Sequence, residues 1–420
     1  MKTIGFAATS LLLASTVLGA CSSDSDTNNP AGLIEVTASG EQLALQGFAF
    51  PPSGDSPYFV DGWEVKLEHL YVTFDNVVVS EGPDTSPTDQ LQKGRDVARV
   101  TGPWAVDLAK GGPLDAKSQG AQAIKITEIP GKNLDGNKAF SADTTYAFGY
   151  DIVKASANAQ KLNLSGDDDA AYGEMTQKGF TVLYVGTATF KGASCTPADE
   201  HLEELPKTVH FRLGFDAATT YVNCQNPDLG GDDHDSPRGL ALKSNQSTVA
   251  QLTVHPDHPF WDARIEDAPL RFDAFALVAH AKSKGESATN PVTLDDLAGV
   301  PFAPITAGGE TLVNRTCSPA TGGAATDLSY DPEGESFADL AQFMRYLQRS
   351  QGHLNSDGLC AVQGIEHGHD HEGEDHDDHD HEPSDAGAVE TDGGSCAPEG
   401  GHCDVSAECC SNDCHDDHCH

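Results

Sequence analysis

The chain has 420 residues, of which 38% are hydrophobic, and a formal net charge of −40 at pH 7. This excess of acid excludes nucleic acids and anionic membrane surfaces as partners bound through charge, because both require many basic side chains, and it favours cations. The length predicts about two or three folding units, and the apolar content is sufficient for one sizeable core.

The N-terminal segment is typical of an exported, lipid-anchored bacterial protein. Residues 4–18 form an apolar run that is too short to cross a membrane and ends in small residues, as secretory signals do. The LGAC sequence that ends in Cys21 resembles the bacterial lipobox, and the resemblance implies that Cys21 carries lipid. We expect a signal peptide over 1–20 and a lipidated tether over 21–32, with Ser22 favouring the outer membrane. The alternative is an ordinary secretory signal with a chance cysteine.

Residues 33–262 have the pattern of a β-rich domain. Short runs of β-branched and aromatic residues are separated by Gly, Pro, Asp and Asn clusters. The expected strands are 33–37, 63–79, 104–108, 123–129, 145–153, 180–190, 209–215 and 249–255. In the second strand the alternation that places Trp63 and His69 on one face changes at Leu70, which predicts a bulge or bend. We therefore expect a mainly β fold, an antiparallel sandwich or barrel.

Residues 263–362 are expected to form a smaller helical part. The stretch 269–282 has the mixed apolar pattern of a partly buried helix. Two further helix starts are predicted at Thr293 and Ser336, because each precedes an acid by three positions, as in a capping box.

The segment 363–395 is expected to be disordered, and it carries the strongest functional signal. Its core, residues 366–382, contains six His, nine acids and two Gly, so it cannot bury apolar surface. Imidazole nitrogen binds zinc, copper and nickel, and carboxylates add donors and charge. The expected ligands are His367, His369, His371, His376, His379 and His381. This histidine tract resembles the His-rich loops of periplasmic zinc-binding proteins, which implies metal binding; the alternative is a solvated acidic linker.

Residues 396–420 are expected to form a small disulfide-rich unit. Their six cysteines have the spacing C-x6-C-x5-CC-x3-C-x4-C, which resembles the knottin pattern. That resemblance implies the pairs Cys396–Cys410, Cys403–Cys414 and Cys409–Cys419. The residues alone leave many pairings open, and metal thiolates assisted by nearby histidines are the alternative.

The remaining cysteines also suit an oxidising compartment. Ten of the 11 cysteines are left once the lipidated Cys21 is set aside, and an even number permits complete pairing. Four of them precede the histidine tract, and the simplest scheme joins Cys195 with Cys224 and Cys317 with Cys360. No cysteine is then spare as a nucleophile.

A second candidate metal site lies at the end of the last expected strand. His255 and His258 flank a turn, so that both can face one point, with Asp262 or Asp273 nearby. Two histidines in other strands, His69 and His210, are expected to complete the ligand set. The alternative is that each of these histidines is a hydrogen-bonded structural residue.

The segment from His255 to Leu297 also carries a resemblance. It is similar to a segment of lipoproteins from predatory, myxobacterial-type bacteria, in which an H-x-x-H-x-F stretch precedes an apolar helix and a calcium-loop-like sequence. Here the corresponding loop, residues 280–287, lacks the acids of an EF-hand, so calcium is not expected there.

These observations predict a metal-binding lipoprotein and not an enzyme. The sequence has no nucleophile elbow, zinc-protease helix, P-loop or dinucleotide fingerprint. The expected function is capture, buffering or delivery of a divalent metal at the outer membrane, with zinc first and copper or nickel as alternatives. Expected partners are the membrane, through the lipid, metal ions and an outer-membrane metal transporter. A surface interaction protein that presents the disulfide-rich tip is the alternative, and a metal-dependent hydrolase using His255 and His258 ranks third.

Overall fold

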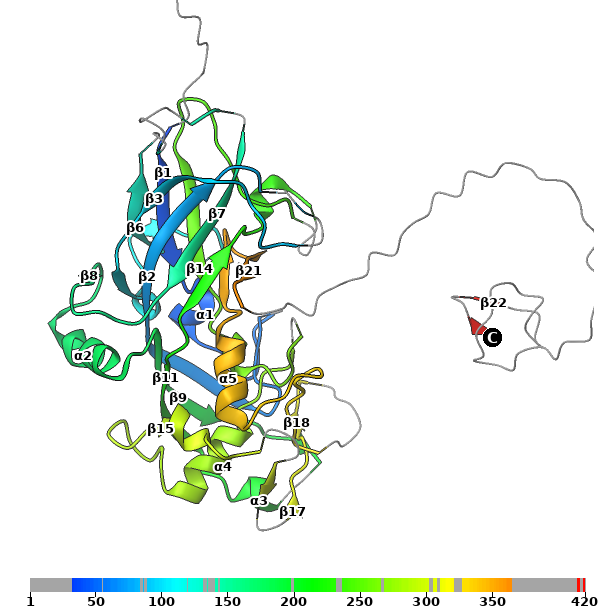
Figure 1. Cartoon of the computed structure of the whole chain (residues 1–420). Coiled ribbons are helices and arrows are strands. Elements are labelled where there is room, and N and C mark those ends of the chain that lie inside the picture. Colours follow the sequence, from blue (N-terminus) through cyan, green and yellow to red (C-terminus); the bar gives the residue numbers. More distant parts are fainter. Residues whose placement is uncertain are drawn as a thin grey trace, which may run out of the picture. The chain divides into compact units, whose positions relative to one another are not determined.

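The computed structural model describes residues 32–364, apart from short gaps, and two strands near the C-terminus (Figure 1). The gaps are 55, 84–85, 87–88, 119, 131–133, 135–139, 143, 198–199, 232–235, 266–267, 302–304, 308–309 and 321–326. The expected signal peptide, Cys21, the histidine tract and most of the disulfide-rich unit lie outside the described residues. The chain divides into two compact units, Met1–His367 and Gly368–His420.

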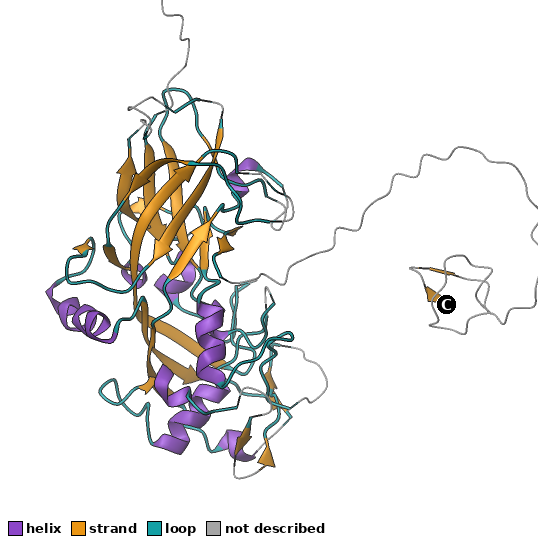
Figure 2. Ribbon diagram, in the orientation of Figure 1, coloured by secondary structure: helices purple, strands orange, loops and turns teal. Residues whose placement is uncertain are grey.

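The first unit is mainly β, with strand content of 37% against 18% helix for the structure, so the predicted fold class is confirmed (Figure 2). One sheet has the strand order β20-β19-β14-β1-β6-β5 and stays open. Its strands are β1 (Ile34–Ser39), β5 (Leu114–Asp115), β6 (Gln122–Ile129), β14 (Thr248–Val254), β19 (Gly352–Leu354) and β20 (Gly358–Leu359). β1 runs parallel to β14, whereas the other pairs are antiparallel. β1 and β14 are far apart in the chain. No short hairpin therefore forces this pair to be antiparallel.

The second sheet has the main path β15-β11-β9-β2-β7-β12-β21, with β3, β4, β8 and β13 beside it. Its strands are β2 (Trp63–Ser80), β3 (Asp96–Val100), β4 (Trp104–Asp107), β7 (Thr145–Ile152), β8 (Gln160–Lys161), β9 (Val182–Phe190), β11 (Thr208–Phe215), β12 (Thr219–Val222), β13 (Leu240–Ala241), β15 (Val292–Thr293) and β21 (Ala361–Val362). The register of β2 against β9 shifts between Leu67 and His69, which confirms the predicted bulge. Of the two architectures predicted, the sandwich-like one is confirmed.

The helices are short and lie between strands along the chain (Figure 2). They are α1 (Glu41–Gln46), α2 (Asp169–Lys178), α3 (Glu200–Glu203), α4 (Asp273–Lys282) and α5 (Leu340–Gln348), with 3-10 turns η1 (Leu108–Lys110), η2 (Gly166–Asp168), η3 (Pro227–Leu229), η4 (His258–Phe260) and η5 (Leu294–Leu297). α5 begins after Asp339 and not after Ser336, because the Asp339 carboxylate accepts the Gln342 N–H as an N-cap. No helix among the described residues has the length and apolar character needed to span a membrane.

The part expected to be helical also contributes strands. β15 pairs with β11, β19 with β14, and β21 with β12, so residues 263–362 complete the sheets built by the preceding residues. Two small pairs of strands stand apart from the main sheets: β10 (Cys195–Thr196) with β18 (Thr316–Cys317), and β16 (Thr306–Ala307) with β17 (Glu310–Thr311). In the second unit, β22 (Cys414–His415) pairs with β23 (His418–Cys419).

Two disulfides hold distant segments of the first unit together. Cys195 is bonded to Cys317, and Cys224 to Cys360, so the predicted pairing of near neighbours in sequence is wrong. Cys195 and Cys317 lie directly opposite each other in β10 and β18. Cys224 follows β12 and Cys360 precedes β21, its antiparallel partner. Sheet pairing therefore decides which cysteines come within bonding distance.

Candidate metal centre

The turn after β14 forms the first half of the site. His255 follows the last residue of β14, and its backbone N–H donates to the Gln351 carbonyl at 2.9 Å. In the next turn, η4, Pro259 has the fixed φ that suits the start of a helical turn. Phe260 is fully buried and packs against Phe48, Phe59, Tyr184, Phe211, Phe272 and Phe275. This anchor fixes His258 relative to His255.

β19 brings a third histidine to the same place. His353 lies directly opposite Thr253 in the antiparallel pair of β19 and β14. Because residues two apart on a strand share a face, His353 is a diagonal neighbour of His255. The residue before His353 is Gly352, whose backbone passes close to the Tyr221 ring. A Cβ at this position would lie 2.3 Å from that ring.

The three imidazoles form one cluster. The His255 and His353 rings stack with centroids 4.0 Å apart, and the His258 ring stands edge-on to both at 5.4 and 5.3 Å. The Trp261 ring stacks on the His258 ring with centroids 3.8 Å apart. His258 and His353 are each 3% exposed. One ligand nitrogen from each histidine lies within 4.8 Å of the others, so this group can hold a metal ion.

Hydrogen bonds leave a lone pair on two of these rings. The Ser350 hydroxyl donates to the Leu347 carbonyl, so it accepts the Nδ1–H of His258 at 2.8 Å. The Nε2 lone pair of His258 is therefore available to a metal. His255 Nε2 lies 3.2 Å from the Ser356 carbonyl, which only accepts, so in its neutral form His255 carries its lone pair on Nδ1. Such outer partners orient metal-binding histidines in proteins.

The electrostatic surroundings of the cluster favour a cation. Burial, together with the neighbouring His353 and His255, lowers the pKa of His258 well below its ordinary value, which keeps this ring neutral. Burial also lowers the pKa of His255, but the carboxylates of Glu41, Asp257 and Asp357 outweigh it and raise that pKa. A positive charge is therefore favoured at His255, and a metal ion supplies one.

Three carboxylates surround His255. Glu41 Oε2 lies 3.8 Å from its Nδ1, and Asp357 Oδ1 lies 3.7 Å from its Nε2. Burial raises the pKa of Asp257, whose Oδ2 accepts the Trp261 indole N–H at 3.3 Å. The other oxygen of Asp257, Oδ1, is buried and accepts no hydrogen bond from the described residues. The site therefore combines nitrogen ligands with an excess of negative charge.

The backbone around His255 is held in unusual conformations. Glu41, Asn355 and Ser356 have positive φ values of 59°, 51° and 77°. Residues other than glycine rarely adopt this region, and such positions are concentrated at binding sites, where the surrounding structure maintains them. Asn355 is fixed by three hydrogen bonds: its side chain donates to Asn226 and Asp228, and it accepts the Gln251 N–H.

Small side-chain movements would bring the cluster to the spacing of a zinc site. Two nitrogens bound to one tetrahedral zinc are about 3.4 Å apart, as follows from a Zn–N distance of about 2.1 Å. The three histidine nitrogens lie up to 4.8 Å apart. Side-chain rotations that move them on the order of an ångström would bring them to the spacing of a zinc site.

No protein-family model, curated protein or solved structure matches this chain.

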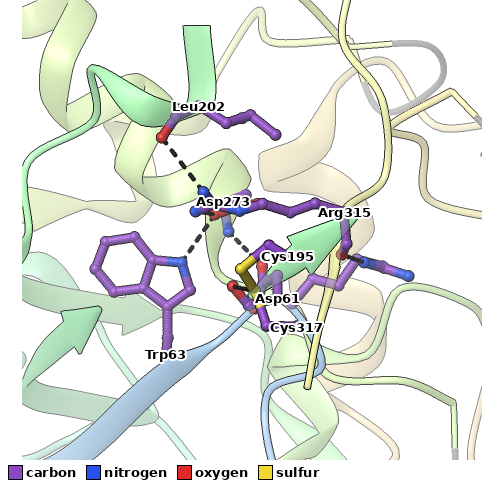
Figure 3. The surroundings of a disulfide bond; sticks show 8 residues. Asp61, Trp63, Cys195, Leu202, Asp273, Arg315 and Cys317 are labelled. Carbon is purple, nitrogen blue, oxygen red and sulfur yellow. Dashed lines mark hydrogen bonds and ion pairs between the residues drawn. A yellow bond between two sulfur atoms is a disulfide. The ribbon is translucent and has the colours of Figure 1, made fainter. Parts of the chain in front are cut away.

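The structure places the other predicted ligands elsewhere. Asp262 accepts a hydrogen bond from Arg271 Nε at 2.6 Å. Asp273 accepts from Arg315 Nε and Nη2 at 2.7 and 2.6 Å and from the Trp63 indole N–H at 2.8 Å, beside the Cys195–Cys317 disulfide (Figure 3). These arginines neutralise both carboxylates. Neither aspartate belongs to the histidine cluster, and the expectation that they join it is corrected.

His69 and His210 are also separate from the cluster. His69 Nδ1 lies 2.7 Å from Asp107 Oδ2 and 3.7 Å from Asp168 Oδ1, a group that could also hold a cation. However, Lys110 Nζ already lies 2.6 Å from Asp168. Burial would raise the pKa of Asp168, yet the hydrogen bond from Lys110 lowers it below its ordinary value. His210 contacts Thr187 Oγ1 at 3.1 Å on the neighbouring strand.

Sequence reasoning missed His353 and the carboxylates of Glu41, Asp257 and Asp357. Residues 355–358 read Asn-Ser-Asp-Gly, a turn signal between two short segments that the structure shows to be β19 and β20. That signal was present, but it does not show that β19 pairs with β14. The six histidines of the tract lie outside the described residues.

Proposed function

We propose that this protein binds a divalent transition metal, zinc first, at a folded centre formed by His255, His258 and His353. The observation that carries the proposal is the meeting of three imidazoles, two of which have a lone pair left available by their hydrogen bonds. Nitrogen donors of this kind favour zinc, copper and nickel over calcium and magnesium. We name this set the inner position.

The proposal includes the compartment and the histidine tract. The lipobox-like segment, the even set of remaining cysteines and the negative charge support a lipid-anchored protein outside the cytoplasm that captures or delivers metal. In this proposal the tract, residues 366–382, is a second and less selective binding element, because a chain with many spaced imidazoles binds ions without fixed geometry.

Zinc titration calorimetry of full-length variants tests this proposal. In the tract variant, all six tract histidines are replaced by Asn, and we expect one zinc ion per chain to remain tightly bound. Adding His353→Gln to the tract variant should weaken this binding by at least about a hundredfold, since one of three nitrogen ligands is lost.

A matched control is His69→Gln in the same tract variant, because His69 is also partly buried beside aspartates but belongs to the group that Lys110 neutralises. It should bind zinc like its parent. If His353→Gln and His69→Gln bind zinc equally well, the folded centre is not a metal site. If only the tract histidines matter, the protein remains a metal binder but without a folded centre.

A further inference from the structure

Exposure changes in steps across the residues around His255. The Asp357 side chain is 51% exposed, and those of Glu41 and His255 are 15% and 13% exposed. His258 and His353 are almost completely buried. An ion that arrives from solvent therefore meets oxygen ligands before it meets the two buried imidazoles.

Glu41, His255 and Asp357 form a compact group of their own. One ligand atom from each lies within 4.8 Å of the others, and His255 is the member that this group shares with the inner position. A neutral imidazole has a single nitrogen lone pair, so His255 can bind an ion in only one of the two places at a time. The two places are thus alternatives and not the halves of a two-ion centre.

A second observation points to a cation in this region. Asp257 is 9% exposed, and its buried Oδ1 accepts no hydrogen bond from the described residues. Among the ion pairs of the described residues, none joins Lys or Arg to Glu41, Asp257 or Asp357. In the His69 group, by contrast, Lys110 supplies the positive charge.

We propose that Glu41, His255 and Asp357 form an outer position, from which a divalent ion passes to the inner position. The ion exchanges its carboxylate ligands for His258 and His353 while His255 stays bound. No covalent bond or redox change is involved, only ligand exchange. This inference rests on the proposed function, because it needs the inner position as the destination of the ion.

Carboxylates suit this role because of their chemistry. They bind both hydrated and partly dehydrated divalent ions, so an ion can be held by them before it has lost all of its water. Imidazoles hold zinc more selectively once water has been lost. An outer position of mixed oxygen and nitrogen ligands thus lets the ion lose its water in two steps.

Stopped-flow mixing of zinc with the full-length tract variant, followed by transfer of zinc to a chromogenic chelator, tests the outer position. With Glu41→Gln and Asp357→Asn, we expect the association rate to fall about tenfold or more, because the ion loses the oxygen ligands that hold it first. The dissociation rate should fall by the same factor, because entry and exit use one route. The equilibrium affinity should then stay within about twofold.

Asp216→Asn is the control for loss of charge alone. Asp216 belongs to neither position, and its half-exposed carboxylate is already paired with Arg345 at 3.2 Å. It should leave both rates unchanged. The Glu41 and Asp357 effect should persist at 0.5 M salt, where attraction between exposed charges is screened.

Several results would overturn the inference. Unchanged rates would remove the outer position, and so would an effect that disappears in high salt. A loss of affinity equal to the loss of association rate would make the carboxylates ligands of the final state. Two zinc ions per folded unit would contradict the sharing of His255. Failure of the proposed function looks different: zinc binding would then be insensitive to His353→Gln.

Discussion

The ring of His353 stacks on the ring of His255 at 4.0 Å, although the two residues are far apart in sequence. The contact follows from the antiparallel pairing of β19 with β14, in which His353 faces Thr253. The His258 ring stands beside both of them. The candidate centre is therefore fixed by a sheet register and by one anchored turn.

The hydrogen bond between His258 and Ser350 should matter for zinc affinity. Ser350→Ala removes the acceptor of the His258 Nδ1–H and leaves the imidazole free to turn or change tautomer. We expect zinc affinity of the tract variant to fall about 10- to 100-fold, as is usual for the loss of such a partner. Competition with a chelator measures this. Ser329→Ala, at a partly buried serine whose hydroxyl donates to the Asp327 carbonyl and to none of the three histidines, should have no effect.

Zinc affinity of the centre should depend on pH through His255. Its pKa is raised above the ordinary value, so it is protonated at a higher pH than a free imidazole, and zinc must displace that proton. His258, with its lowered pKa, is already neutral. As pH is lowered, we expect the zinc affinity of the tract variant to fall tenfold per pH unit, and this fall should already begin above about pH 6.5, the pKa of a free imidazole. A decline of two or more powers of ten per unit would show that more imidazoles titrate.

Stability should depend on pH through Asp61. Burial raises its pKa to about 7, assisted by the neighbouring Asp273 carboxylate. The folded state therefore holds a proton that the unfolded state releases, and the contribution of Asp61 to stability falls as pH rises from about 4 to about 7. In urea unfolding, the free energy of unfolding of Asp61→Asn minus that of the native chain should increase as pH rises from about 4 to about 7. Above about pH 7 this difference should be constant. A pH-independent difference would contradict the raised pKa.

The lipid anchor is tested at Cys21. If the LGAC sequence is a lipobox, Cys21→Ser removes the lipid, and the protein leaves the membrane fraction. Mass spectrometry of the N-terminal peptide from native envelope distinguishes the acylated cysteine from a free N-terminus. A mature N-terminus other than Cys21 would favour the alternative of an ordinary secretory signal.

Local pattern was sufficient to predict much of the fold. Eight expected strands correspond to β1, β2, β4, β6, β7, β9, β11 and β14, and the change of alternation at Leu70 marked the bulge in β2. These features depend on neighbouring residues, since side chains alternate between the faces of a strand. The pair His255 and His258 was also predictable, because one short turn connects both residues.

Only the tertiary structure decided which distant residues meet. The cysteine pairs, the parallel pairing of β1 with β14 and the return of residues 352–362 to the sheets all join segments far apart in sequence. The residue types alone made Asp262, Asp273, His69 and His210 candidate ligands. In the structure, Arg271 neutralises Asp262, Arg315 neutralises Asp273, and Lys110 neutralises the aspartates beside His69. His353 entered the centre because the register of β19 against β14 places it diagonally across from His255. Periodicity along one strand determines which face a side chain takes, whereas the partner strand determines what that face meets.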